Sequence, residues 1–251
     1  SWRKADLAAR IPFVALLALT LTATWYAVYS LARSPQAQPV AFAFGGEAKP
    51  SDYSRAIADG ALLALIACLG LAQLSHEATG YLAQLACATL IFFAVATLPY
   101  HTVAPAVAMV VGMVGLTLAG APALASLLGV GSIALVALAP ATPSERRLRW
   151  AVMLAIVTVL AAMLAWQLDL WRWRLLDTAT QGKEFKSLAR LLLWFGWPAW
   201  PMAAWTLWRW RKQLFNRQVH RHLWLPLWFS IVSVGATLTT QPADRALLVG
   251  L

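Results

Sequence analysis

The sequence predicts an all-α fold, a polytopic bundle of transmembrane helices. Of its 251 residues, 61% are hydrophobic and only 12% are charged, and the mean hydropathy is +0.65. Uncharged apolar runs of about 20 residues, the length that a helix needs to cross the hydrocarbon core of a bilayer, recur along the whole chain. They indicate about eight spans and the start of another, in a single transmembrane domain over residues 1–251.

The positive charge of the chain lies in short clusters beside these apolar runs. The formal net charge is +10, but the sequence shows no continuous basic patch of the kind that a soluble nucleic-acid-binding domain carries. Lysine and arginine beside spans are typical of cytoplasmic loops that meet anionic lipid headgroups. We therefore expect membrane lipids as partners and no nucleic acid.

The first two spans follow from their flanking residues. Residues 11–32 are bounded by arginines, and Pro12 falls in the first turn, where its missing N–H does no harm. A polar connection with three prolines and a Gly-Gly pair then predicts a loop. The second span is expected over residues 52–75, with Asp52 as its N-cap after a proline.

Three further spans follow in quick succession, over residues 81–98, 103–119 and 123–139. Because only a few residues connect them, they are expected to be antiparallel neighbours. Small residues recur every four positions near the start of the third run, at Ala121, Ala125 and Gly129. This ridge predicts a close approach of another helix.

The last complete spans are expected over residues 150–168, 191–208 and 223–239. Pro198 and Pro201 interrupt the second of these, which indicates either a kinked packing helix or the wall of a cavity. A break of this kind is also found in the discontinuous helices of transporters.

The stretch from 194 to 213 carries six tryptophans and ends in a basic cluster. Indole rings favour the boundary between lipid tails and headgroups, and cations beside them meet phosphates. We expect an interfacial belt of Trp205, Trp208, Arg209, Trp210, Arg211 and Lys212. The loop 209–222, with five lysines and arginines, is expected to be cytoplasmic. An even number of spans would have to separate this loop from the N-terminal basic cluster of Arg3, Lys4 and Arg10 if both were cytoplasmic. Seven spans separate them, so either one of the three short runs between 81 and 139 is re-entrant or the N-terminal basic cluster is external.

Ionisable residues within or beside spans are candidate binding residues because they are costly there. In the second span these are Asp52, Tyr53, Arg55 and Asp59. Arg55 and Asp59 are four residues apart, on one helix face, so they predict either a salt bridge that seats the helix or a guanidinium that binds a phosphate or anionic headgroup.

At the other end of that span, His76 and Glu77 stand in a polar turn. They are either ordinary turn residues that meet water or a base with its hydrogen-bonded neighbour. His220 and His222 are two residues apart, which points them to different helix faces, so we expect no metal pair there and an interfacial position for both. No motif for a nucleotide, a cofactor or a metal is present, and Cys68 and Cys87 lie in apolar runs.

The segment "AARIPFVALLALTLTATWYAVYSLAR", residues 8–33, resembles a recurrent segment of the GT-C glycosyltransferases, the family of aminoarabinose transferases and protein O-mannosyltransferases. Its Ala-Ala-Arg-Ile-Pro start is similar to the Ala-Ala-Arg-Leu-Pro of that family. The segments "FAFGGEAKPSDYSRAIADGALLALIACLGLAQLSHEATG", "WFGWPAWPMAAWTLWRWRKQ" and "HLWLPLWF" also resemble a bacterial branch of it.

The resemblance implies a polyprenyl-phosphate sugar donor, an acceptor in the cell envelope and a bacterial inner-membrane location. It implies that the catalytic acid lies in an external loop before Ser1, so the catalytic residues are unknown. The sequence opens at Ser1 without a signal peptide and stops as a new apolar run begins, so we interpret it as an internal fragment that lacks its N-terminal external loop and its C-terminus. It leaves a divalent metal open, although no residue of this chain indicates one. The alternatives are a transporter or lipid flippase, and a non-catalytic assembly subunit.

Overall fold

The computed structural model describes residues 2–39, 48–68, 71, 80–138, 144–171, 190, 193–194, 197, 199–214 and 220–239. The regular elements within these ranges are all helical, which confirms the all-α class. They are α1 (Trp2–Ala32), the short 3-10 helix η1 (Pro35–Ala37), α2 (Pro50–Ala67), α4 (Gly80–Thr97), α5 (Val103–Leu118), α6 (Pro122–Leu138), α7 (Ser144–Gln167), α9 (Ala199–Arg209), α10 (Arg211–Leu214) and α11 (Arg221–Thr239).

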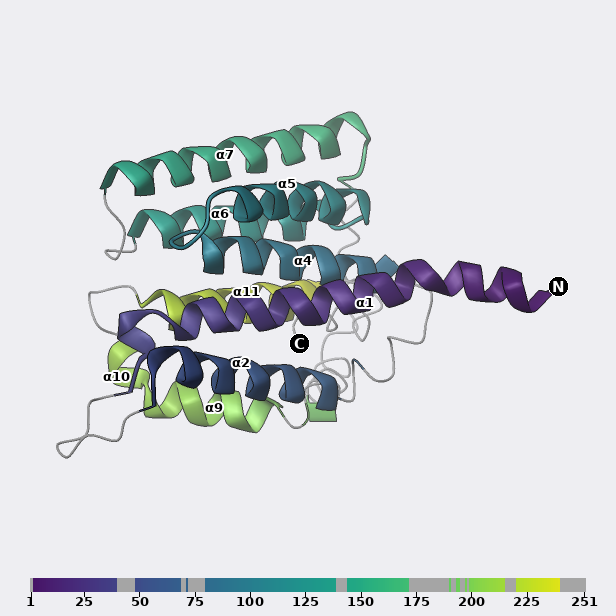
Figure 1. Ribbon diagram of the computed structural model, residues 1–251. Helices are drawn as coiled ribbons and strands as arrows, with labels where there is room; N and C mark the ends of the chain where they lie inside the picture. The colour runs from purple at the N-terminus through teal and green to yellow at the C-terminus, as the bar shows by residue number, and fades with distance from the viewer. Residues whose placement is uncertain are drawn as a thin grey trace.

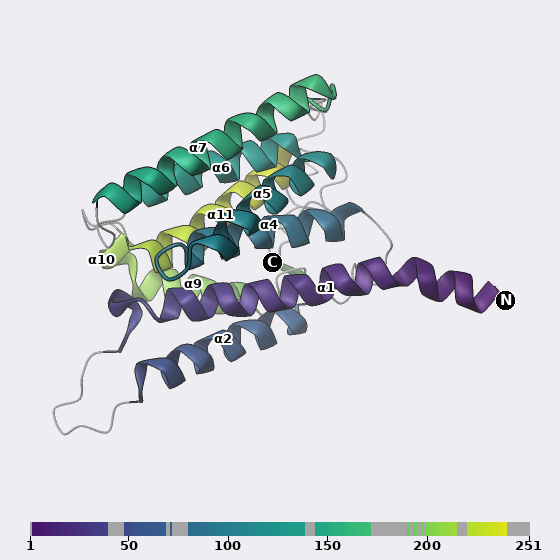
Figure 2. The same ribbon diagram turned by 45° about the horizontal axis from the view of Figure 1, so that its top comes forward.

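The long helices lie side by side, and the N-terminal part of α1 projects beyond the rest (Figure 1). In both views (Figures 1 and 2) α7 lies at one edge of the bundle and α1 lies between α4 and α2, while in Figure 1 α9 lies beyond α2. Helix α1 packs against α2 and α4, α4 against α5, and α6 against α7 and α11. The short connections of the α4–α5–α6 segment give antiparallel neighbours, as the sequence predicts.

The expectation of eight spans is wrong in number. Three helices of the described chain are long and apolar enough to cross a membrane, namely Arg10–Ala32, Gly80–Thr97 and Glu145–Gln167, and two shorter apolar helices accompany them. Helices α5 and α6 have 16 and 17 residues. At 1.5 Å per residue they reach only about 24–26 Å, short of a hydrocarbon core of about 30 Å. Helix α2 carries three charged residues in its 18, and α9 has only 11.

Three expected helix starts also differ from the structure. Helix α1 begins at Trp2, so Pro12 lies inside it rather than in its first turn. Helix α2 begins at Pro50, and Asp52 lies in its first turn instead of capping it. A carboxylate there still interacts favourably with the positive end of the helix dipole. Helix α9 begins at Ala199, with Pro201 in its first turn. Pro198 lies outside the described residues.

A tight turn connects α5 to α6. Gly120 adopts a φ of 85°, its N–H donates to the Thr117 carbonyl, and the Ala121 N–H donates to the Leu116 carbonyl. This is the Schellman pattern, in which glycine takes the left-handed conformation after the last helical turn. It satisfies the free carbonyls of α5 and reverses the chain within a few residues.

Glycines allow three close helix contacts in the apolar core. A Cβ at Gly115 would lie 2.5 Å from the Cys87 Sγ of α4, and one at Gly129 would lie 2.5 Å from the Thr158 Oγ1 of α7. The close approach predicted for the small-residue ridge is therefore confirmed at Gly129. At Gly131, an added Cβ would overlap the indole of Trp228 of α11. The α6–α11 packing thus depends on the absence of a side chain at this position.

We expect Gly131→Val to destabilise the protein by about 1–3 kcal/mol, the usual cost of overpacking a filled core, and to lower the thermal unfolding midpoint in detergent. Gly60→Ala in α2 is the matched control, because nothing lies within 4 Å of a Cβ there. Alanine is favoured over glycine in a helix by about 0.5–1 kcal/mol, so this variant should be as stable as the wild type or slightly more stable. Equal midpoints for the two variants would contradict the packing described here.

Candidate functional site

One end of the bundle collects most of the described basic residues. Helices α1, α4, α6 and α9 end there and α2, α5, α7 and α11 begin there, at the left of Figures 1 and 2. We call it the basic end. Its lysines and arginines are Arg33, Lys49, Arg55, Arg146, Arg147, Arg149, Arg209, Arg211, Lys212 and Arg221. Its described carboxylates are Asp52 and Glu145. Such a surface attracts anionic lipids and phosphates.

The start of α1 lies at the opposite end of the bundle from α10, which carries Arg211 and Lys212 (Figure 1). Each helix from α4 to α7 runs from one end of the bundle to the other. Whether one of these runs is re-entrant in a membrane or the N-terminal basic cluster is external stays a prediction.

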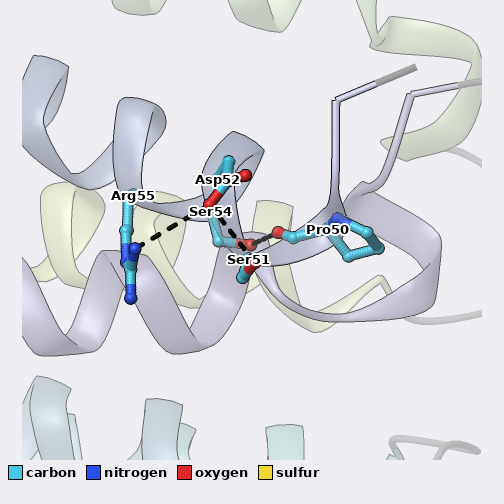
Figure 3. Close-up of polar contacts among 5 residues, drawn as sticks. All are labelled: Pro50, Ser51, Asp52, Ser54 and Arg55. Atoms are coloured by element: carbon cyan, nitrogen blue, oxygen red, sulfur yellow. Dashed lines mark hydrogen bonds and ion pairs between the residues drawn. The ribbon is translucent and has the colours of Figure 1, made fainter. Parts of the chain in front are cut away.

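On α2, Arg55 pairs with Asp52 and not with Asp59 as the four-residue spacing predicts. The Arg55 Nη1 lies 3.8 Å from the Asp52 Oδ1, and the two side chains are 64% and 57% exposed (Figure 3). Ser54 points inward and its hydroxyl donates to the Pro50 carbonyl at 2.6 Å. An exposed ion pair of this length contributes about 0–1 kcal/mol, so Arg55 is free to exchange Asp52 for another anion.

Asp59 has a partner on the neighbouring helix. The indole Nε1 of Trp25 in α1 donates to the Asp59 Oδ1 at 2.7 Å. The Trp25 ring stacks on Tyr29, with 5.3 Å between centroids, and makes an edge contact with Tyr26. This combination of a carboxylate with three aromatic rings was not expected from the sequence, because the two helices come together only in the tertiary structure.

The other predicted residues are not all placed. Tyr53 lies half-buried on α2, beside the ion pair in sequence. His76 and Glu77 lie outside the described residues. Within the described part of the chain, no group of three or more His, Cys, Asp or Glu side chains is placed to hold a metal.

The predicted belt residues lie on α9 and α10, except for Trp210, which lies in the turn between them, and no residue of either helix is buried. The rings of Trp205 and Trp208 lie 5.2 Å apart, and the Arg211 guanidinium lies 4.9 Å above the Trp208 ring. Arg211 also donates to the Trp208 carbonyl at 2.9 Å. Trp210 contacts the His222 ring edge to face, with 5.7 Å between centroids. Exposed indoles covered by cations are suited to a headgroup layer.

A second cationic group lies where α1, α4 and α11 meet. The Arg33 guanidinium lies 5.3 Å above the Tyr100 ring, and the Arg221 Nη2 donates to the Ala96 carbonyl at 3.2 Å. Burial raises the pKa of Tyr100, and the nearby Arg221 and Arg33 oppose this by favouring the phenolate. Burial lowers the pKa of Arg221. We call Arg33, Tyr100 and Arg221 the arginine–tyrosine cluster.

Two histidines flank Arg221. The rings of His220 and His222 lie 5.8 Å apart, and the Nδ1 of His220 and the Nε2 of His222 are buried without a hydrogen-bond partner. Burial, followed by His220 and Arg221, lowers the pKa of His222 to about 4. His222 is therefore neutral at pH 7.

The sequence did not single out the arginine–tyrosine cluster. Each of its residues borders an apolar run and was interpreted as the boundary of a span or as part of a loop. The available signal was that Arg33, Tyr100 and Arg221 all follow or precede a run directly. Residues so far apart in the chain come together only because α1 and α4 end at the same level and α11 begins there.

Comparison of the chain with protein-family models, with curated proteins and with solved structures gives no significant match.

The pKa of His222 predicts a pH-dependent stability. The unfolded chain binds this proton below about pH 6.5, the ordinary value, whereas the folded protein binds it only below about pH 4. The contribution of His222 to stability should therefore be constant above pH 6.5 and should fall as the pH drops from 6.5 towards 4. Thermal unfolding midpoints across this range should show a smaller decline in His222→Gln than in the wild type. The control His101→Gln, which replaces an exposed histidine at the same end, should keep the wild-type profile.

The Trp25–Asp59 hydrogen bond predicts a coupling between α1 and α2. In a double-mutant cycle with Trp25→Phe and Asp59→Ala, we expect a coupling free energy of about 0.5–1.5 kcal/mol in unfolding experiments. The pair Trp25→Phe and Asp52→Ala, whose members share no contact in the structure, should be additive. A coupling near zero for the first pair would show that the bond contributes nothing in solution.

Proposed function

We propose that this chain is the membrane-embedded body of a glycosyltransferase that takes a sugar from a polyprenyl-phosphate donor and passes it to a lipid, glycan or protein acceptor of the bacterial cell envelope. The GT-C-like segments of the sequence, the apolar helices and the basic end support the proposal. In this proposal the chain binds the donor, and a carboxylate in a segment before Ser1 activates the acceptor. The proposed location is the inner membrane.

The observation that carries the proposal is the exposed row on α2. Arg55 lies near the start of α2, at the basic end. Leu63 and Ile66 follow eight and eleven residues later, on the same helix face, and are 67% and 51% exposed. A cation followed along one face by exposed apolar side chains is complementary to an amphiphile with an anionic head and an isoprenoid tail. The same helix thus offers contacts for both parts of a polyprenyl phosphate.

The chemistry of this row suits a glycosyl phosphate. A guanidinium binds phosphate through two parallel hydrogen bonds, and Arg55 gives up only a weak exposed ion pair to do so. Asp59 lies one turn further along, about 6 Å away. Its Oδ2 is not used by Trp25, so it is available to accept a hydrogen bond from a sugar hydroxyl. As the sugar is transferred, Arg55 would stabilise the charge that develops on the polyprenyl phosphate.

We expect Arg55→Ala to weaken binding of the polyprenyl-phosphate sugar by about 10- to 100-fold, the effect of losing 1.5–3 kcal/mol of charged hydrogen bonds. The measurement is sugar transfer and donor binding by the complete protein in vesicles. Arg146→Ala is the matched control, since it removes the same charge from the basic end on α7 and should change neither quantity by more than about twofold. A complete protein that neither binds the donor nor transfers sugar contradicts the proposal, and solute transport without transfer would favour a transporter.

The proposal also requires a particular orientation. The family resemblance places the Ala-Ala-Arg-Ile-Pro end of α1 in the cytoplasm, so the opposite, basic end would face outward, where the donor is used. The abundance of arginine and lysine alone favours the reverse orientation. With Cys68 and Cys87 replaced by alanine, a cysteine introduced by Lys212→Cys should react with a membrane-impermeant maleimide in intact spheroplasts. Reaction only after the membrane is opened would contradict the donor site at this end.

A further inference from the structure

Arg221 is a largely buried cation without a charged partner. One of its donors reaches the Ala96 carbonyl at 3.2 Å, and no carboxylate of the described residues lies within salt-bridge distance of it. The one ion pair among those residues is Arg55 with Asp52. Burying a guanidinium without an anion is costly, and the lowered pKa of Arg221 reflects that cost. The remaining donors of Arg221 are therefore the first indication of a missing ligand.

Further polar groups converge on the same place from different helices. Arg33, at the end of α1, lies above the Tyr100 ring, and Tyr100 follows α4 close enough to Arg221 for that charge to favour the phenolate. Two cations and a phenol from three helices thus lie together, and no carboxylate of the described residues lies within salt-bridge distance of either arginine. One anionic ligand would satisfy the donors that the protein leaves unused.

The ligand that fits these groups is an anion with several oxygens. Two guanidinium groups repel a metal ion, so the histidines are poorly placed to hold one. A carboxylate offers two oxygens in one plane, whereas a phosphate offers oxygens in several directions and suits donors from three different helices.

We propose that Arg33, Tyr100 and Arg221 form a phosphate-binding site at the junction of α1, α4 and α11. This site is separate from the α2 row, because α1 lies between α2 and α4 in both views (Figures 1 and 2). It does not depend on the proposed transferase activity. The phosphate is that of an anionic lipid headgroup or a free phosphate ion, and both present the same oxygens to these residues.

The test measures ligand-induced stabilisation of the complete protein in a phosphate-free maltoside detergent. The probes are inorganic phosphate and phosphatidylglycerol, titrated separately while the thermal unfolding midpoint is followed. We expect at least one probe to raise the midpoint of the wild type. A response to phosphatidylglycerol alone identifies a lipid headgroup, and a response to both identifies the phosphate group itself as the ligand.

The decisive variant is Arg221→Gln, which removes the charge but keeps an amide donor. This variant should lower the affinity for the responding probe by about tenfold. Arg149→Gln removes an exposed arginine of the same end, and it should bind the probe with the wild-type affinity. Since Arg221→Gln removes an unpaired buried charge, its stability without ligand should not fall. If this variant does not fold, Arg33→Gln and Tyr100→Phe provide the same comparison at less buried positions.

Two results would overturn the proposal. One is a wild type whose midpoint responds to neither probe. The other is an equal loss of response in the Arg221 and Arg149 variants, which would show that the charge of the whole basic end, and not this cluster, attracts the anion. Arg55→Ala should leave the probe response intact, so that failure of the transferase proposal and failure of this one are told apart.

Discussion

The packing of α1 along α4 is the contact on which the arrangement of this protein depends. Helix α1 contacts α2 on one side and α4 on the other, and both α1 and α4 end at the basic end. Small buried residues lie on both helices, among them Ala23 and Ala27 on α1 and Ala88 and Ala94 on α4. Their size allows the two backbones to approach closely. Because α1 and α4 end at the same height in the bundle, Arg33 lies against Tyr100, and α11 begins beside them.

Close packing of side chains, rather than hydrogen bonds between helices, holds most of the helices together. The buried hydroxyls of Thr89, Thr117, Ser132 and Thr158 each donate to the carbonyl four residues earlier in their own helix. They are satisfied without a partner on another helix, so they add little to helix association. Among the described residues, the hydrogen bonds from Gln84 to the Ala119 carbonyl and from Arg221 to the Ala96 carbonyl join helices near their ends, and the bond from Trp25 to Asp59 joins α1 and α2 further inside. Few polar bonds therefore connect one helix to another.

The sequence located the candidate α2 residues but not their partners. Arg55 and Asp59 share a helix face, and spacing alone made them the expected ion pair. In the structure Arg55 turns to Asp52, and Asp59 accepts the N–H of Trp25. Local spacing limits a side chain to a few neighbours on its own helix. Local spacing contains no information about which other helix lies alongside. The hydrogen bond between Trp25 and Asp59 depends on the position of α1 beside α2, so it could not be predicted from spacing.

The sequence by itself determined that the chain is helical, apolar and rich in cations beside its apolar runs, because these properties follow from composition and local spacing. It also identified the short turns of the α4–α6 segment and the small-residue contact at Gly129. The tertiary structure alone decided how long each helix is, which helix ends share a level, and that Arg33, Tyr100 and Arg221 meet. The physical reason is that these outcomes depend on contacts between residues far apart in the chain, where close packing selects one arrangement among several that local patterns allow.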